Sequence, residues 1–412
     1  MKKLMVKIVT VCLWIYCCIA YFDPSDLVLG AKLPLFALIL LTFLMIRLKS
    51  DGALPRDLLV RVSLIALIIP AFYLGIFLVR HPGQSIIEGL SLAKGLLAIM
   101  LVLPVVALRI DLKKPVLLCI SLMILFIIGL QACSSLNPWL FQKISFFLTG
   151  NYVALIGSRS FGELNLAMIF FITTPLLVIP VPFLVGAAFA TKGGWWRRSG
   201  AFSFLLLILL ASFFSASRAV FLVLLAEYLV CFLIAVRHRP GLLAGGVMLS
   251  VTFSLLALLA LQRSSLLSAE EQSNMIKIAH FESFLDYIDE NPVILLTGDG
   301  LGASYNSRAP GVSREVYQTE LTYLDIIRYS GLAGFLVFLL LLIVPFCTTK
   351  FDFLNFTGFL AYLLVAGSNP LLFNSTGMLA VTYFWSQQYS SGRMKCHVNP
   401  SCTSVVSCGA AL

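Results

Sequence analysis

The sequence predicts an all-α fold, a polytopic bundle of about 12 transmembrane helices with one large loop on the outer side of the membrane. Of the 412 residues, 60% are hydrophobic and 12% are charged. A soluble domain carries about 25% charged residues, so a single soluble core could not hide this much apolar surface. The apolar residues form long continuous runs, which indicate helices rather than the alternating strands of a membrane barrel.

The predicted helices are the apolar runs, which follow one another at 4–22, 31–48, 58–79, 88–108, 115–133, 164–190, 199–214, 218–236, 241–262, 331–348, 353–367 and 375–387. The run at 164–190 contains Pro175, Pro180 and Pro182, which predict a kinked helix. The chain therefore divides into helices one to nine (1–262), a large, partly helical loop (263–330), helices ten to twelve (331–390) and a tail (391–412).

Lysine and arginine mark one side of this predicted bundle, because they are frequent in alternate short loops and scarce in the loops between them. Such an excess is typical of the cytoplasmic side. The basic loops contain Lys2, Lys3, Arg47, Lys49, Arg56, Arg61, Arg109, Lys113, Lys114, Lys192, Arg197, Arg198, Arg237, Arg239, Lys350, Arg393 and Lys395. Both termini are therefore predicted to be cytoplasmic. The formal net charge of +10 arises from these loops, so it predicts no nucleic-acid partner.

The loop at 263–330 is too long for a simple connection, and its composition predicts an ordered segment. Between Met275 and Ile288, apolar residues recur at helical spacing opposite a charged face. This pattern predicts a helix that packs on the mouth of the bundle or lies in the membrane interface. After this helix, the stretch 297–302 (Thr-Gly-Asp-Gly-Leu-Gly) is rich in turn-forming residues.

Arg218 is the first candidate functional residue. It lies in the sequence Ser215-Ala-Ser-Arg-Ala219, between two apolar runs with almost no loop. A charge in this position is costly unless it is paired or faces water, so a functional role is expected. Ser217 supplies a hydroxyl donor beside it. The alternative is an arginine that extends from a helix end to the membrane surface.

Arg159 is a second cation on the predicted outer side. We expect it just ahead of the helix that begins at 164, and an arginine at a helix N-terminus favours binding of an anion. The alternative is a salt bridge to Glu163, which follows four residues later.

A third group of charged residues lies at the end of the large loop and includes Arg308, Arg314, Glu320 and Arg328. Spacings of four and eight residues would place Glu320, Leu324 and Arg328 on one face of a helix. A carboxylate and a guanidinium at a membrane mouth can serve as a general base and a phosphate clamp. The alternative is a solvated charged rim, which the residues by themselves slightly favour.

The chain contains no pattern for a metal or a nucleotide. With four histidines and no His-Glu pair of a zinc protease, we expect no metal catalyst. The stretch 297–302 follows no βαβ strand and lacks the Gly-Lys-Ser/Thr of a nucleotide loop. We therefore expect no cofactor, and an enzyme on the outer side would need an activated, lipid-borne substrate.

Taken in order, several motifs resemble those of the O-antigen ligase/polymerase superfamily. They are Arg159-x-x-Gly162-x-x-Asn165, Ser215-x-Ser217-Arg218, Asn291-Pro292-x5-Gly298-Asp-Gly-x-Gly302, Glu320-x10-Gly331-x-x-Gly334 and Asn369-Pro-Leu-Leu-Phe-Asn374. Ligases of this family carry a histidine eleven residues before the first glycine of the last GxxG, where this chain has Glu320. The segment 317–324 is similar to that of exopolysaccharide and colanic-acid-type repeat-unit polymerases.

The resemblance implies polymerisation of undecaprenyl-pyrophosphate-linked repeat units, as in O-antigen, capsule or exopolysaccharide synthesis. The reaction would take place at the periplasmic face of the bacterial inner membrane, without metal or nucleotide. The implied partners are the lipid-linked glycans, the bilayer, a chain-length regulator and a flippase. Glu320 would orient or deprotonate the acceptor hydroxyl, and Arg218 would act beside it. The pyrophosphate would be bound by Arg159, Ser217, Arg218, Arg308, Arg314 and Arg328.

Two other functions are compatible with the sequence. An O-antigen ligase has the same layout but would require the missing histidine. A lipid-linked oligosaccharide flippase or other transporter predicts charged groups inside the spans, for which Lys94 and Glu227 are candidates. Such a transporter would not require a structured outer loop.

Overall fold

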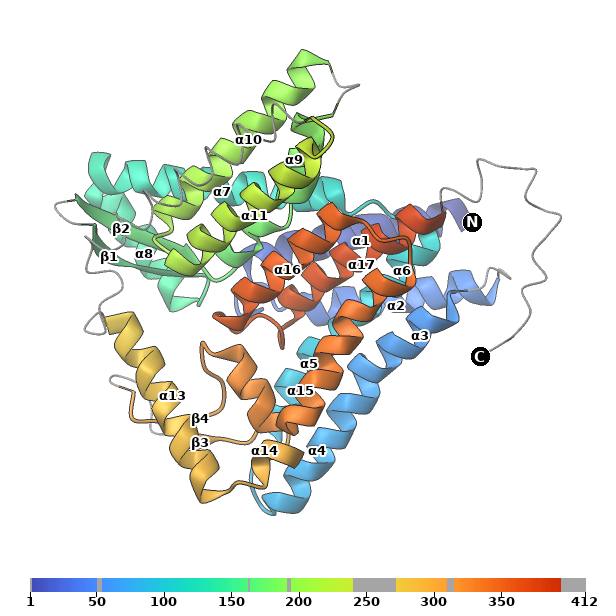
Figure 1. Cartoon of the computed structure of the whole chain (residues 1–412), viewed down its shortest axis with the longest axis vertical. Helices are drawn as coiled ribbons and strands as arrows, with labels where there is room; N and C mark the ends of the chain where they lie inside the picture. The colour runs from blue at the N-terminus through green and yellow to red at the C-terminus, as the bar shows by residue number, and fades with distance from the viewer. Residues whose placement is uncertain are drawn as a thin grey trace.

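The computed structural model describes residues 2–49, 54–161, 164–190, 194–239, 272–309 and 315–393. The described chain is mostly helical, and Figure 1 shows long helices packed beside one another. Seven of the described helices are long and apolar enough to cross a membrane. A multi-pass helical membrane protein, as the sequence predicts, is therefore confirmed. The expected span at 241–262 and the tail beyond Arg393 lie outside the described residues.

The first half of the chain forms long rods, two of which change their helical pitch ahead of a proline. A π-helical turn precedes Pro70, and a 3-10 turn precedes Pro104. Proline has no amide hydrogen, and its ring crowds the carbonyl group four residues earlier, so a regular helix cannot continue there. The elements are α1 (Lys2–Phe22), α2 (Lys32–Leu48), α3 (Arg56–Ser63), η1 (Leu64–Ile68), α4 (Ile69–Arg80), α5 (Ile87–Leu97), η2 (Ala98–Leu101), α6 (Val102–Leu108), α7 (Lys113–Leu136) and α8 (Pro138–Gly150).

A β-hairpin replaces the first part of the helix that we expected at 164–190, so the fold is not strictly all-α. Strands β1 (Ala154–Phe161) and β2 (Leu164–Phe171) pair antiparallel, and η3 (Thr174–Val178) and α9 (Val181–Ala188) follow. The prediction of one kinked helix is wrong because β2 pairs its backbone with β1.

Arg159 accordingly lies within β1, opposite Leu166, and not ahead of a helix. The expected anion site at a helix N-terminus is therefore wrong for this residue. Its side chain lies outside the described part of the chain.

The second half adds five long helices, and the buried residues of both halves join into one core. These helices are α10 (Trp195–Phe214), α11 (Arg218–Val236), α15 (Thr322–Thr348), α16 (Phe353–Gly367) and α17 (Ser375–Arg393). Large apolar side chains in the middle of the bundle are exposed, among them Leu67, Phe72, Phe126 and Leu336. An apolar belt of this kind requires a lipid environment rather than water.

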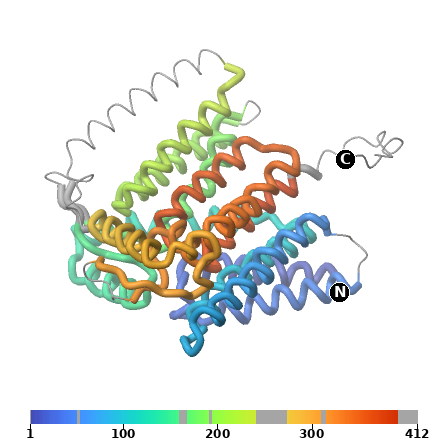
Figure 2. The backbone as a smooth tube through the Cα atoms, turned by 60° about the horizontal axis from the view of Figure 1, so that its bottom comes forward, coloured from blue at the N-terminus to red at the C-terminus, as the bar shows by residue number. Residues whose placement is uncertain are grey.

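A separate layer, which we call the cap, covers one end of the bundle and consists of the described residues between 272 and 321. It contains α13 (Gln272–Glu290), α14 (Ile294–Thr297) and the strand pair β3 (Tyr305–Asn306) and β4 (Glu315–Val316). The helix predicted between Met275 and Ile288 is confirmed as part of α13. Figures 1 and 2 place the cap beside the ends of α4 and α15, far from the start of α1 and the end of α17.

Replacement of Gly95 by alanine is predicted to destabilise the bundle. The added Cβ would lie 2.0 Å from the carbonyl oxygen of Phe373, so α5 would have to move away from the turn before α17. Overpacking of this kind costs about 1–3 kcal/mol. Gly129→Ala in α7 is the matched control, because nothing lies within 4 Å of its Cβ. Thermal unfolding in lipid nanodiscs compares the two variants, and equal midpoints would contradict the close packing at Gly95.

Candidate functional site

A break in α15 anchors the cap to the bundle. Gly331, inside this helix, has φ 67° and ψ 174°, a conformation that is accessible to glycine but strained for other residues. Near the break, the carbonyl oxygens of Arg328 and Tyr329 accept hydrogen bonds from the amides of Asp299 (2.7 Å) and Gly300 (3.1 Å). The two glycine motifs of the sequence, at 298–302 and 331–334, therefore dock against each other.

Glycines permit this docking because no side chain would fit. A Cβ at Gly298 would lie 2.3 Å from the carbonyl oxygen of Tyr329. On the opposite side, a Cβ at Gly300 would lie 2.4 Å from the amide nitrogen of Phe77 in α4, and one at Gly302 would lie 2.5 Å from a backbone nitrogen of α5. The turn-rich stretch is thus wedged between α4, α5 and α15.

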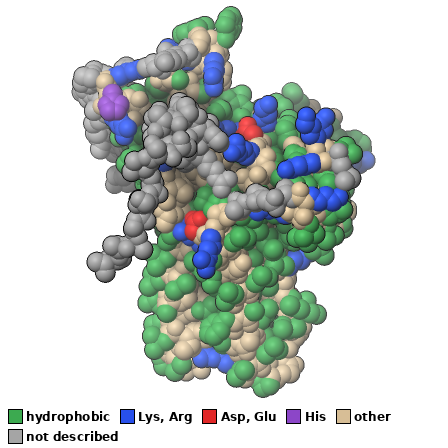
Figure 3. All heavy atoms as spheres, turned by 90° about the vertical axis from the view of Figure 1, so that its right-hand side faces the viewer, with side chains coloured by type: hydrophobic (Ala, Val, Ile, Leu, Met, Phe, Trp, Pro, Cys, Tyr) green, Lys and Arg blue, Asp and Glu red, His purple; other side chains and the backbone are tan. Residues whose placement is uncertain are grey.

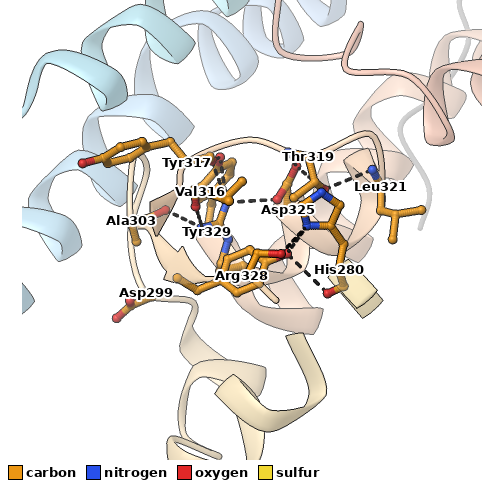
Figure 4. Close-up of polar contacts among 12 residues, drawn as sticks. His280, Asp299, Ala303, Val316, Tyr317, Thr319, Leu321, Asp325, Arg328 and Tyr329 are labelled. Carbon is orange, nitrogen blue, oxygen red and sulfur yellow. Dashed lines mark hydrogen bonds and ion pairs between the residues drawn. The ribbon is translucent and has the colours of Figure 1, made fainter. Parts of the chain in front are cut away.

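Arg328 holds the rest of the cap on this anchor (Figure 4). Its side chain is fully buried. Nη1 donates to the carbonyl oxygens of Ala303 (2.6 Å) and Val316 (3.1 Å), and Nη2 donates to the carbonyl oxygen of Tyr317 (2.6 Å) and to Asp325 (2.9 Å). Because these donors point at the protein, Arg328 fixes the cap in this structure. The pyrophosphate-binding role that the sequence suggested for Arg328 stays a prediction.

Asp325 completes the network around Arg328. One oxygen of its carboxylate binds the guanidinium, and the other accepts hydrogen bonds from the amide (2.6 Å) and the hydroxyl (3.0 Å) of Thr319. A buried carboxylate with three donors is well satisfied, whereas an unpaired one would be costly. The segment that leads into α15 is therefore held in place by an ion pair inside the protein.

Glu320 lies ahead of α15, which begins at Thr322. The expectation that Glu320, Leu324 and Arg328 share one helical face is wrong, because Glu320 precedes the helix, and the hydrogen bonds of Thr319 to Asp325 hold the chain there in a non-helical course. The Glu320 carboxylate is 48% exposed and lies 3.4 Å from the ammonium group of Lys277. It is therefore accessible at the surface of the cap.

Asp299 is a buried carboxylate that the sequence analysis did not select. It is 5% exposed and accepts a hydrogen bond from the hydroxyl of Tyr287. Nε2 of His81 lies 3.0 Å and Nη1 of Arg80 lies 3.4 Å from its oxygens. Burial, together with the hydrogen bond and negative charge of Asp299, raises the pKa of the Tyr287 hydroxyl well above its usual value, so this hydroxyl stays protonated. Two features of the sequence could have indicated this site: the basic pair Arg80-His81 at the end of an apolar run, and an aspartate between two glycines.

A polar groove of about 1080 Å³ lies between α13 and the β3–β4 pair. Hydroxyl, carboxylate and guanidinium groups line it together with two tyrosine rings. These groups come from Ser283, Asp286, Tyr287, Glu290, Tyr305, Ser307, Arg308 and Glu315. A ligand with many hydroxyl groups suits such a lining, because each hydroxyl needs a hydrogen-bond partner when it leaves water. The predicted residue Arg308 is exposed here and pairs with Asp286 at 2.9 Å.

Arg218 and Ser217 lie at a different element, the tight turn between α10 and α11. Arg218 is the first residue of α11, Ser217 precedes the helix, and both are partly exposed. The turn is shaped by Ala216, which has φ +54°, and by Ser215, whose hydroxyl donates to a carbonyl group of α10 at 2.7 Å. The predicted residue Arg314 lies outside the described residues.

His280 is a buried histidine of α13 behind the groove. Its Nδ1 lies 2.9 Å from the hydroxyl of Ser307, a residue of the groove wall. Burial lowers the pKa of this imidazole below 6.5, although the negative charges of Asp325 and Glu320 act in the opposite direction. We therefore expect a neutral His280 at pH 7.

Replacement of Asp299 by asparagine is predicted to loosen the cap. A neutral amide removes the negative charge that Arg80 and His81 face, and a change of this kind costs about 1–3 kcal/mol. Hydrogen exchange of the amides between 272 and 299 should accelerate. Asp289→Asn, at an exposed position of α13, makes the same change of charge and is the control. Equal exchange in the two variants would show that the Asp299 contacts do not stabilise the cap.

Acid is predicted to destabilise the cap through His280. Because the pKa of this imidazole is lowered in the folded protein, its contribution to stability is complete above about pH 6.5 and is lost as the pH falls below that value. The unfolding midpoint should therefore decrease between about pH 7.5 and about pH 5.5, and His280→Gln should make this decrease smaller. An identical decrease in the wild type and the variant would refute this role.

Neither a metal centre nor a known relative assigns a chemistry to this site. Within the ranges that the structure describes, no group of three or more His, Cys, Asp or Glu side chains is arranged to hold a metal ion. Comparisons with protein families, with curated proteins and with solved structures find no match. The resemblance to the O-antigen ligase/polymerase superfamily therefore depends on the sequence motifs alone and stays a prediction.

Proposed function

We propose that this chain polymerises undecaprenyl-pyrophosphate-linked oligosaccharide repeat units at the periplasmic face of the bacterial inner membrane. The observation that carries the proposal is the polar groove in a cap held on the ends of membrane-length helices. A groove of this size and polarity suits a glycan, and its position beside the bilayer suits a glycan attached to a lipid. The motifs that resemble the superfamily supply the anchor of this cap, at 298–302 and 331–334.

The distribution of charge supports a periplasmic cap. Figure 3 views the side of the molecule that bears the start of α1, and Lys and Arg side chains gather over the upper part of this view. An excess of these residues is typical of the cytoplasmic side, so the cap at the other end would be periplasmic and both termini cytoplasmic. The seven long helices, the two shorter apolar helices and the run at 241–262 make ten spans, and the proposed number of twelve also requires α2 and α17 to cross the membrane.

The proposed reaction is a glycosyl transfer between two lipid-linked substrates. A hydroxyl group of the acceptor repeat attacks the anomeric carbon of the growing chain, and the bond from this carbon to the phosphate oxygen breaks. Undecaprenyl pyrophosphate leaves with the electron pair, and the hydroxyl proton passes to a carboxylate. Because the donor is already activated, the protein mainly positions both substrates and stabilises charge. We assign the carboxylate to the accessible Glu320 and part of the charge stabilisation to Arg218.

One observation favours a flippase as the second candidate function. Glu227 lies in the middle of α11, is buried, and has no hydrogen-bond partner among the described residues for either carboxylate oxygen. An isolated carboxyl group inside a membrane span is costly and is typical of ion or proton pathways. A flippase does not explain the polar groove, so we place it second.

Deletion of the gene in its native strain tests the proposed function. For a polymerase, single repeats that have crossed the membrane but have not grown should appear at the cell surface. The absence of any outer-face repeat would favour the flippase. Full-length polymer that remains on undecaprenyl pyrophosphate would instead indicate a ligase. Glycan electrophoresis and mass spectrometry distinguish the three outcomes.

Complementation of this strain with variants tests the assignment of residues. Glu320→Gln and Arg218→Ala are each predicted to reduce polymer formation at least about tenfold, since each removes a charge from the transition state. Glu282→Gln is the control, because this exposed glutamate of α13 is also in the cap but does not line the groove. Normal polymer from well-expressed Glu320→Gln and Arg218→Ala proteins would show that the assignment is wrong.

A further inference from the structure

A second cavity, of about 220 Å³, lies where α1, α2, α5 and the turn before α17 meet. We call it the lysine cavity. Its polar lining includes Lys32, Ser91, Lys94, Gln318, Asn374 and Ser375. The motif Asn369-Pro-Leu-Leu-Phe-Asn374 forms the turn on one side of the lysine cavity. The motif does not line the polar groove.

Lys32 is held at the wall of the lysine cavity by the loop between α1 and α2. Its side chain is buried, and its ammonium group donates one hydrogen bond, to the carbonyl oxygen of Pro24 at 2.5 Å. The loop itself is fixed by Asp23, whose carboxylate accepts hydrogen bonds from the amides of residues 27–29. An ammonium group has three donors, so Lys32 can serve an anion without losing its contact to Pro24.

Lys94 contributes a second cation from α5. It lies seven residues after the start of this helix, about 10 Å along its axis, which is deep for a lysine at a membrane surface. Ser91, Leu92 and Lys94 line the lysine cavity, whereas Leu96 is buried in the core and does not line it. The exposed Lys94 side chain is therefore directed to this cavity by the packing of its own helix.

The walls of the lysine cavity carry two ammonium groups and one carboxylate, that of Asp26. Lys94 repels Lys32, while Asp26 and Asp23 attract it. Asp23 is not among the lining residues, and three backbone amides already bind its carboxylate, so the side chains that face the cavity are more cationic than anionic. The N-terminus of the 19-residue helix α17 adds partial positive charge, with Asn374 accepting a hydrogen bond from the amide of Gly377 at 2.7 Å. A charge at this depth is costly unless a counter-ion neutralises it.

The lysine cavity and the groove are joined by one short segment of the cap. Glu315 lines the groove, and Gln318 lines the lysine cavity. Three residues of extended chain span at most about 11 Å, so the two sites are close together along this segment. An anionic head group in the lysine cavity would place an attached sugar beside the groove.

We propose that the lysine cavity binds the phosphate groups of a lipid carrier between Lys32 and Lys94. The inference rests on the proposed function, in which two lipid-linked substrates meet and each brings its own pyrophosphate. One arginine turn at Arg218 cannot neutralise both, and the lysine cavity supplies the second site. Its chemistry is that of a lipid phosphate, which a polyprenyl carrier or a bilayer phospholipid can provide.

Binding to the purified full-length protein in phosphatidylcholine nanodiscs tests this proposal. Geranylgeranyl pyrophosphate serves as the lipid probe, inorganic pyrophosphate as the lipid-free probe and phosphatidylglycerol as the bilayer-phospholipid probe. Lys94→Gln should weaken binding of geranylgeranyl pyrophosphate by about tenfold or more, because one charged hydrogen bond is lost. Lys94→Arg, which keeps the charge, should retain most of the affinity. Lys143→Gln removes an exposed lysine of α8 and should leave binding unchanged.

The three probes and the variants give distinct outcomes. Equal binding by wild type and Lys94→Gln, or equal losses in Lys94→Gln and Lys143→Gln, would overturn the proposal. A Lys94-dependent phosphatidylglycerol affinity equal to that for geranylgeranyl pyrophosphate would support the phosphate site and assign it to bilayer lipid. If binding depends on Lys94 but the deletion strain still makes normal polymer, the phosphate site in the lysine cavity is supported and the proposed polymerase function is refuted. Lys32→Gln is the second variant, to be judged after its unfolding midpoint confirms that it folds.

Discussion

Backbone hydrogen bonding at Gly331 is the constraint on which the cap depends. A helix that breaks next to an apolar bundle leaves carbonyl groups without partners, and each such group costs several kcal/mol if it stays unsatisfied in a nonpolar environment. The amides of Asp299 and Gly300 satisfy the carbonyl groups of Arg328 and Tyr329. This exchange is possible only where the two chains approach without side chains, which explains the glycines at 298, 300 and 331. The position of the cap thus follows from a requirement of the backbone.

Arg328 holds the rest of the cap in a similar way, because it also satisfies backbone carbonyl groups. A buried guanidinium is costly unless its donors are used. Here carbonyl groups from three separate residues and the carboxylate of Asp325 accept hydrogen bonds from Nη1 and Nη2, whereas Nε has no partner among the described residues. Such a cation stabilises only one arrangement of the chain, because each acceptor must lie in the plane of the guanidinium. Consequently Arg328 serves the fold, and the proposed chemistry would depend on groups that water can reach, such as Glu320 and the lining of the groove.

The sequence predicted the helical membrane bundle and the helix in the large loop, because apolar runs and helical spacing are local features. It did not predict the hairpin at 154–171, since a short apolar run is compatible with both a strand and a helix, and the pairing partner decides. The sequence also did not distinguish Arg328 from a surface residue. The acceptors of Arg328 are mostly backbone carbonyl groups, and every residue has such a group, so no side-chain pattern reveals them. Asp299 was missed because its partners are distant in the chain and only the fold brings them together. Arg80 is more than 200 residues away from it, and Tyr287 is about 12 residues away.

The segment from Glu315 to Glu320 connects the structural network with the proposed chemistry. Glu315 faces the groove, Gln318 faces the lysine cavity, and Thr319 is bound by Asp325, which in turn is held by Arg328. A glycosyl transfer between two lipid-linked substrates depends on the distance and angle at which they meet, so whatever separates their binding sites must be rigid. The buried ion pair of Asp325 and Arg328 provides that rigidity. Residues that never touch a substrate would therefore set the geometry in which Glu320 acts.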